Sequence, residues 1–183
     1  MSAHRDLLPS SLTDKPIVLV GMMGSGKSSV GRRLASRLRL PFYDADDEIE
    51  TAAGLKVAEI FERYGEPYFR DGERRVIGRL LDHRRCVIAT GGGAFAEDDT
   101  RAMILDRGTA IWLDVPVSVL VDRVSRRGHR PLLAGRNPAE VLTDLLAKRG
   151  PAYAEAPLRV EADAAPHGRA VEAILAALKD QFT

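Results

Sequence analysis

The stretch Gly21-Met22-Met23-Gly24-Ser25-Gly26-Lys27-Ser28 decides the fold of this chain, because it follows the pattern G-x-x-x-x-G-K-S. An apolar run at 17–20 precedes it and suits a buried strand, and apolar residues follow it at helical spacing. A glycine-rich turn between a strand and a helix is the context of a phosphate-binding loop. Its glycines let backbone N–H groups converge on an anion, and the new helix adds the positive end of its dipole. The motif therefore predicts that Lys27 reaches the β- and γ-phosphates of a nucleotide and that the Ser28 hydroxyl binds Mg²⁺.

Length and composition predict one globular domain. The chain has 183 residues, a net charge of +1 and 5% aromatic residues, and it has no apolar run long enough to span a bilayer. These values give no support for a nucleic-acid or membrane partner. We expect a flexible extension over 1–14, a single domain over 15–183 and a cytoplasmic location. The one cysteine, Cys86, excludes an internal disulfide and begins an apolar run, so we expect a buried residue without a reactive thiol.

Short apolar runs alternate with helical patterns along the chain, which predicts an α/β fold with a parallel sheet covered on both faces. The expected strands are 16–20, 41–43, 86–90, 110–115 and 158–162. The expected helices lie near 27–38, 46–53, 57–64, 66–82, 97–106, 116–126, 138–148 and 168–181. In such a sheet, ligands gather beyond the carboxyl ends of the strands.

An acidic segment, Phe42-Tyr43-Asp44-Ala45-Asp46-Asp47-Glu48-Ile49-Glu50, follows the second expected strand. Alternation along an extended chain would keep Asp44 and Asp46 on one side, at the sheet edge where the phosphate loop lies. One carboxylate could bind Mg²⁺, and the other could orient and deprotonate an attacking hydroxyl. The alternative is an acidic first turn of a helix, favoured by the helix dipole. Asp47, Glu48 and Glu50 fit that alternative well.

The third expected strand ends in Thr90-Gly91-Gly92-Gly93, which predicts a ligand close to the backbone. No aspartate ends this strand, where a Walker B motif would place one. Asp114 ends the next strand, and we expect it to cap the following helix ahead of Pro116.

The segment 123–136 carries five arginines and reads as a lid that excludes water and brings cations to the phosphoryl group. It could equally be a surface loop, and His129 within it is a weaker candidate base than Asp46. By pattern alone, nothing distinguishes Arg70 within its charged helical segment. Lys148 and Arg149 fit the basic end of a helix.

Taken together, these motifs resemble the shikimate kinase family over residues 16–181. The resemblance rests on the ordered set GMMGSGKSSVGRRLA (21–35), FYDADDEIE (42–50), IFERYGEPYFRDGE (60–73), ATGGGA (89–94), RPLLAG (130–135) and KRGPAY (148–153). It implies transfer of the γ-phosphate of ATP to the 3-hydroxyl of shikimate, giving shikimate 3-phosphate and ADP in aromatic amino acid biosynthesis. It also implies a three-layer α/β/α fold with strand order 2-3-1-4-5, a substrate-binding segment at about 44–75 and a lid at about 124–137. We expect a monomer that uses Mg²⁺ with ATP.

The resemblance also assigns site residues by motif. The ATP-binding set is Gly24, Ser25, Gly26, Lys27, Ser28, Ser29, Arg123, Arg130 and the position of Ala165. The shikimate-binding set is Asp46, Arg70, Gly91, Gly92, Gly93 and Arg149, with the two arginines on the substrate carboxylate. The resemblance implies that Ser28 ligates Mg²⁺ and that Asp44 contacts the metal through water. Asp46, Lys27 and Arg130 form the catalytic group.

One departure concerns the loop 163–168, which has Ala165 where the family often places an arginine beside adenine. Two alternatives to the implied function are a gluconate-type small-molecule kinase and a non-catalytic phosphate-loop switch. The paired arginines and the D-A-D element argue against the first. The intact Lys27, Ser28, Asp46 and Arg130 argue against the second.

Overall fold

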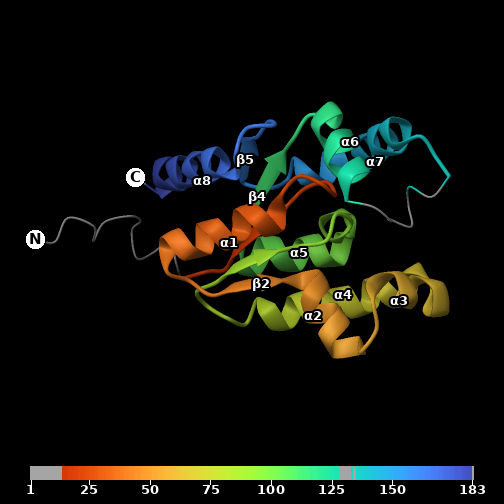
Figure 1. The fold of residues 1–183 in the computed structure, drawn as a ribbon. Coiled ribbons are helices and arrows are strands. Elements are labelled where there is room, and N and C mark those ends of the chain that lie inside the picture. The colour runs from red at the N-terminus through yellow and green to blue at the C-terminus, as the bar shows by residue number, and fades with distance from the viewer. Residues whose placement is uncertain (1–13, 128–132, 134, 183) are drawn as a thin grey trace, which may run out of the picture.

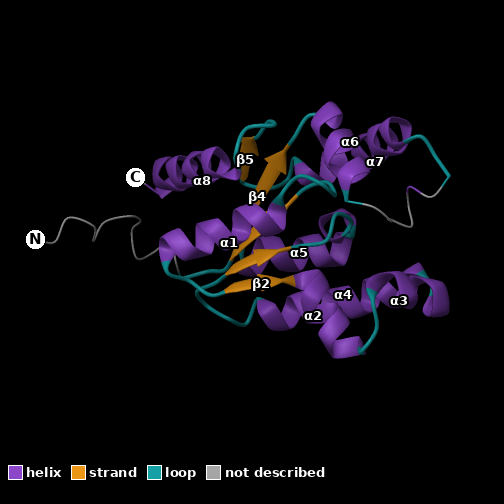
Figure 2. Ribbon diagram, in the orientation of Figure 1, coloured by secondary structure: helices purple, strands orange, loops and turns teal. Residues whose placement is uncertain are grey.

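The computed structural model describes residues 14–127, 133 and 135–182. Most of the expected extension over 1–14 lies outside this range, as do the lid residues His129 and Arg130. Figure 1 shows a central sheet with helices on both sides and is coloured from the N-terminus to the C-terminus. Figure 2 shows the same view coloured by secondary structure. None of the helices in the described residues combines the length and apolar composition that crossing a bilayer requires.

Five parallel strands form the sheet in the order β2-β3-β1-β4-β5, which confirms the expected strand order. Their bounds are Ile17–Val20 (β1), Phe42–Asp44 (β2), Val87–Ala89 (β3), Thr109–Asp114 (β4) and Leu158–Glu161 (β5). β1 lies at the centre, with Val18 opposite Ile88 of β3 and Ala110 of β4. Because all strands run the same way, the phosphate loop, Asp44 and the glycines after β3 emerge at one edge.

The helices also follow the expected order. Their bounds are Lys27–Leu38 (α1), Ala45–Ala53 (α2), Val57–Tyr64 (α3), Glu66–Leu80 (α4), Asp98–Arg107 (α5), Val117–Arg126 (α6), Pro138–Tyr153 (α7) and His167–Phe182 (α8), with a 3₁₀ turn at Ala94–Ala96 (η2). Asn137 caps α7 through its side chain, ahead of Pro138 at the first helical position.

Two apolar cores lie on opposite faces of the sheet, because successive residues of each strand point to opposite sides. Ile17 and Leu19 of β1 pack with α1 and α8, whereas Val18 and Val20 belong to a larger core with α4, α5, α6 and α7. The first core includes Leu34 and Ile174, and both cores are shielded from solvent. This arrangement is the expected three-layer α/β/α fold (Figure 1).

The structure corrects three sequence-based expectations. Asp114 does not cap α6, whose N-cap is Pro116; the carboxylate instead accepts hydrogen bonds from Arg159 on the neighbouring strand β5. α7 does not end near residue 148 but continues to Tyr153, whose side chain is fully buried and anchors the last turn. The extended segment ends at Asp44, so strand alternation does not relate Asp44 to Asp46, which lies in the first turn of α2.

Candidate active site

The phosphate loop joins β1 to α1 in a conformation that requires glycine. Gly26 is the N-cap of α1 with φ 92°, a left-handed value that side chains disfavour, and Gly24 has φ 79°. A Cβ at Gly24 would come within 3.0 Å of the Val124 side chain, so α6 also packs tightly on the loop. α1 therefore begins within the loop, where the backbone N–H groups of a first helical turn can donate to an anion.

The Lys27 side chain contacts the backbone of its own phosphate loop. Its side chain is buried, and Nζ donates to the carbonyl oxygens of Gly21 and Met22, each at 2.8 Å, and to Ser25 Oγ at 3.4 Å. These contacts hold the ammonium group at the mouth of the phosphate loop. The residues Ser25 to Ser29 lie together here, as the motif predicts for an ATP-phosphate cradle.

Ser28 and Asp44 meet across the sheet edge. The Ser28 hydroxyl donates to Asp44 Oδ2, while Asp44 Oδ1 accepts from the backbone N–H of Asp46 at 3.0 Å and thereby caps α2. This oxygen-only pair suits Mg²⁺, which uses few protein ligands and completes its shell with water and substrate phosphates. The described residues contain no cluster of three His, Cys, Asp or Glu side chains that could hold a metal alone. The donor set therefore fits a Mg²⁺ that arrives with a nucleotide.

The three glycines after β3 let charged side chains approach the backbone. A Cβ at Gly91 would lie 3.0 Å from both Asp46 Oδ1 and Glu73 Oε2, and one at Gly93 would lie 2.3 Å from Arg70 Nη2. A side chain at Gly93 would thus collide with the Arg70 guanidinium. Two carboxylates and one guanidinium therefore surround this glycine turn.

Arg70 and Glu73 form an ion pair on α4 that faces the glycines. Arg70 Nη1 donates to Glu73 Oε1 at 2.8 Å, and Arg70 also pairs with Glu66 at 3.3 Å and with Glu97 at 3.9 Å. The Glu73 side chain is fully buried, and within the described part of the chain its Oε2 has no hydrogen-bond partner. Burial raises the pKa of Glu73 above its ordinary value, the Arg70 charge opposes that rise, and Asp46 and Glu97 add to it. The pair fixes where the Arg70 guanidinium can lie.

Arg149 approaches the same turn from α7. Its Nη1 is buried, has no hydrogen-bond partner among the residues that the structure describes, and lies 3.4 Å from the position that a Cβ at Gly92 would occupy. One turn later, the Tyr153 hydroxyl donates to the Gly92 carbonyl oxygen, and burial raises the pKa of Tyr153 to about 12. A buried cationic donor without a partner is costly, so this geometry favours an anionic ligand beside Gly92.

The two halves of the site touch at Gly92. A Cβ there would lie 3.1 Å from the backbone nitrogen of Met23 in the phosphate loop. An anion held by the loop and a ligand held by Arg70 and Arg149 would therefore be neighbours, with the Asp46 carboxylate beside them.

A cavity of about 160 Å³ is lined by Ser25 of the phosphate loop and by residues of α6, α8 and the loop after β5. Arg123 lines it and donates to the Gly24 carbonyl oxygen at 3.2 Å and to the Asp163 carbonyl oxygen at 2.9 Å, tying α6 to the loop after β5. Ala165 also lines the cavity, and so does His167, whose Cε1 would meet a Cβ on Gly26 at 2.9 Å. Burial lowers the pKa of His167, and the charges of Arg123, Arg33 and Arg127 lower it further.

The structure brings together every expected site residue that it describes, in two groups beside the phosphate loop. Arg130 lies outside the described residues. Sequence reasoning missed Glu73, Tyr153 and His167. The first two had a local signal, because Glu73 follows Arg70 by three residues and Tyr153 follows Arg149 by four, the spacings of neighbours on a helix. Their burial depends on distant segments and had no such signal.

Comparisons with known proteins agree with this geometry. The family model described as "Shikimate kinase" matches residues 23–179. Among curated relatives, "Shikimate kinase" of Caulobacter vibrioides is 58% identical over 95% of this chain and 86% of its own length. "Shikimate kinase" of Novosphingobium aromaticivorans is 55% identical over 92% of this chain and 89% of its own.

Solved structures give the same result. "Shikimate kinase from Acinetobacter baumannii in complex with shikimate" superposes with a TM-score of 0.89 at 38% identity, covering 94% of this chain and 98% of that one. A gluconokinase from Sinorhizobium meliloti 1021 covers 93% of this chain and 96% of its own with a TM-score of 0.58, at only 21% identity. That second likeness shows a shared fold alone.

Proposed function

Because the chain belongs to the shikimate kinase family, we propose that its site transfers the γ-phosphate of ATP to the 3-hydroxyl of shikimate. The products are shikimate 3-phosphate and ADP, and the reaction serves aromatic amino acid biosynthesis. The observation that carries the proposal is the buried, unpartnered Nη1 of Arg149, which lies beside Gly92 and across the glycine turn from Arg70. This pair suits the carboxylate of a small, hydroxylated acid.

The donor half of the site is the phosphate loop. The backbone N–H groups of Gly24 to Ser29 donate to ATP phosphates at the start of α1. Lys27 leaves the carbonyl oxygens of Gly21 and Met22 and turns to the β- and γ-phosphates when a nucleotide displaces it. Arg123 lines the cavity on the nucleotide side, with Ala165 and His167 opposite, and so contacts the base.

Mg²⁺ fits the oxygen pair of Ser28 and Asp44, where it would neutralise phosphate charge during the transfer. Ser28 offers its hydroxyl directly. Asp44 acts through water, as the family resemblance implies, while its Oδ1 caps α2. The same contact holds the start of α2 in place and thereby positions Asp46.

The acceptor half holds shikimate against the donor. Arg70 and Arg149 bind its carboxylate, and the glycines at 91–93 admit its ring close to the backbone. Asp46 accepts the proton of the 3-hydroxyl and orients its oxygen toward the γ-phosphate. Glu73 holds Arg70 at the glycine turn through the 2.8 Å ion pair.

The lid over about 124–137 would close on the bound nucleotide, with Arg130 adding positive charge to the transferring phosphoryl group. Closure would exclude water, which competes with the alcohol as acceptor. We further propose that the enzyme is a cytoplasmic monomer of one domain.

A comparison of acceptors tests the proposal. Purified protein is incubated with ATP and Mg²⁺ and with shikimate, gluconate or no acceptor, and ADP release is followed. We expect turnover with shikimate and only a trace with the other two. Equal turnover without acceptor, or preference for gluconate, would overturn the assignment.

A further inference from the structure

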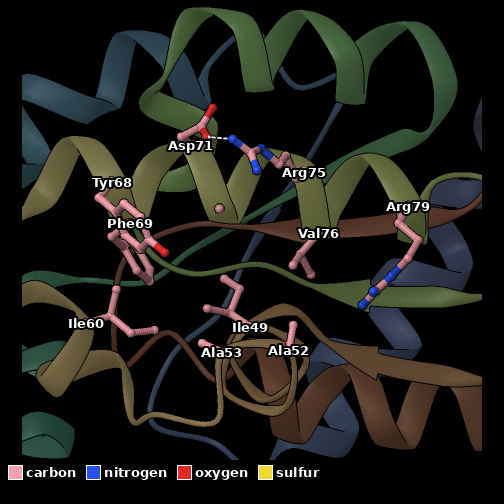
Figure 3. Close-up of a pocket in the computed structure, with 11 residues that line it drawn as sticks. Ile49, Ala52, Ala53, Ile60, Tyr68, Phe69, Asp71, Arg75, Val76 and Arg79 are labelled. Atoms are coloured by element: carbon pink, nitrogen blue, oxygen red, sulfur yellow. Dashed lines mark hydrogen bonds and ion pairs between the residues drawn. The ribbon is translucent and has the colours of Figure 1, made fainter. Parts of the chain in front are cut away.

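A mostly apolar hollow outside the site just described lies between α2 and α4. It measures about 460 Å³, within the range of ligand pockets in proteins. Figure 3 shows Ile49, Ala52 and Ala53 of α2 beneath the stretch of α4 that carries Val76. We call this hollow the α2–α4 groove.

The groove has an aromatic end. Tyr68 and Phe69 lie there, and Tyr68 is 58% exposed and packs on Tyr64 with ring centroids 4.6 Å apart. Among the described residues, Tyr64 and Tyr68 are the large hydrophobic side chains that remain exposed. Phe69 is buried and pairs with Phe61 at 4.5 Å. This end offers ring faces to an aromatic ligand.

The other end of the groove is cationic. Arg79 lies there, and Arg75 lies at the rim, where its guanidinium pairs with Asp71 above α4 in the view of Figure 3. Two arginines and one aspartate line the rim, and Arg79 also pairs with Glu48, which does not line the groove. Arg75 and Arg79 are 76% and 58% exposed, so their ion pairs with Asp71 and Glu48 hold them weakly and leave donors for a ligand. The rim therefore offers guanidinium donors from which a carboxylate can accept hydrogen bonds.

Gly72 keeps the middle of the groove open. It lies inside α4, where glycine destabilises the helix relative to alanine. A Cβ there would meet no atom within 4 Å, so packing does not require the glycine. Its effect is to leave space between the aromatic end and the arginines.

We propose that the α2–α4 groove is a second binding site, which takes a small aromatic carboxylate. The ring lies against Tyr68 and the apolar floor, and the carboxylate accepts hydrogen bonds from Arg75 and Arg79. Helical spacing places Gly72, Arg75 and Arg79 on one face of α4, and Arg70 and Glu73 on a face turned well away from it. The site is therefore separate from the acceptor pocket, although both use α4.

Calorimetry with 3-phenylpropanoate tests the proposal on the full-length protein saturated with shikimate and ADP. We expect a dissociation constant in the millimolar range or below, about 10 mM at most. The uncharged 3-phenylpropan-1-ol and the ring-free hexanoate should bind more weakly. No binding, or displacement of the probe as shikimate is raised, would overturn the proposal, since displacement would place the probe at Arg70 and Arg149.

Matched variants locate the probe. Arg75→Gln combined with Arg79→Gln should weaken binding about tenfold. Arg74→Gln is the control, because Arg74 also pairs with Asp71 but does not line the groove. Gly72→Leu fills the groove and should abolish binding, with kcat for shikimate unchanged as evidence of folding. Equal weakening by Arg74→Gln, or full binding by a folded Gly72→Leu protein, would refute the site; the arginine variants decide the matter if Gly72→Leu does not fold.

Discussion

Replacing Arg149 by methionine should make the ligand-free protein more stable and the enzyme worse. Arg149 Nη1 is buried and has no hydrogen-bond partner in residues 14–127, 133 and 135–182. Methionine keeps most of the side-chain length and apolar contact while it removes the charged donor. The substitution leaves the Tyr153 hydroxyl with its acceptor, the Gly92 carbonyl oxygen, but removes the Arg149 charge and hydrogen bond that oppose the rise in the pKa of Tyr153.

The size of each effect follows from that one group. An unsatisfied buried donor costs about 1–3 kcal/mol, so its removal should stabilise the free protein by about 1 kcal/mol after lost contacts are counted. In a protein of this size, that is an increase in Tm of about 2–4 °C. Loss of a charge-assisted hydrogen bond to the shikimate carboxylate costs about 1.5–3 kcal/mol, which raises KM about 10- to 150-fold. Because the contact exists before the transition state, kcat should change little.

Urea unfolding without ligands and ADP release at varied shikimate measure the two effects. Lys148→Met is the matched control, since Lys148 precedes Arg149 on α7 and is exposed; it should leave both the unfolding midpoint and KM unchanged. A variant that is less stable than wild type and has an unaltered KM for shikimate would refute the reasoning, because Arg149 would then be a structural residue.

Three further predictions concern Asp46, Glu73 and the buried thiol of Cys86. Asp46→Asn should abolish phosphoryl transfer, because it removes the proton acceptor. ATP affinity, measured by calorimetry, should stay within about twofold of wild type, because the phosphate loop is unchanged. Turnover at the wild-type rate would show that Asp46 has no role in the mechanism. Glu73→Gln should raise the KM for shikimate about tenfold by loosening Arg70. Burial raises the pKa of Glu73, so protonated Glu73 contributes stability to the folded protein that is complete below the unfolded-state pKa and is lost as pH rises through the folded-state pKa. The urea midpoint of Glu73→Gln relative to wild type should therefore be higher at pH 8 than at pH 5. A difference that stays constant with pH would contradict the assignment. Burial raises the pKa of Cys86 to about 11, so iodoacetamide at pH 8 should label the native protein far more slowly than the urea-unfolded protein, and equal rates would contradict the buried position.

The fold and the donor half of the site were predictable because their signals are local. The phosphate-loop motif specifies the glycine that adopts φ 92° before Lys27. The apolar runs that form β1 and β3 are continuous in sequence. Strand order followed from the family resemblance. The error at Asp114 has a physical reason: its partner, Arg159, is 45 residues away on β5, and local capping was the nearer explanation.

The acceptor half could be named from the family resemblance, whereas residue pattern alone was too weak to identify it. Arg70 lies among several arginines on α4, and only packing shows that it turns toward Gly93 while Arg74 and Arg75 turn to Asp71. Glu73 looked like one more surface charge and is fully buried. Which face of a helix becomes a site depends on the elements packed against it, and sequence spacing alone does not contain that information.

The position of the transferred phosphate tests the central claim most directly, because the claim is that the phosphate loop and the glycine turn at 91–93 hold one hydroxyl against the γ-phosphate. Product formed from ATP and shikimate is isolated and analysed by phosphorus–proton correlation NMR. The account predicts a single phosphomonoester coupled to the proton on C3. Phosphate on another hydroxyl, or only inorganic phosphate and ADP, would contradict it.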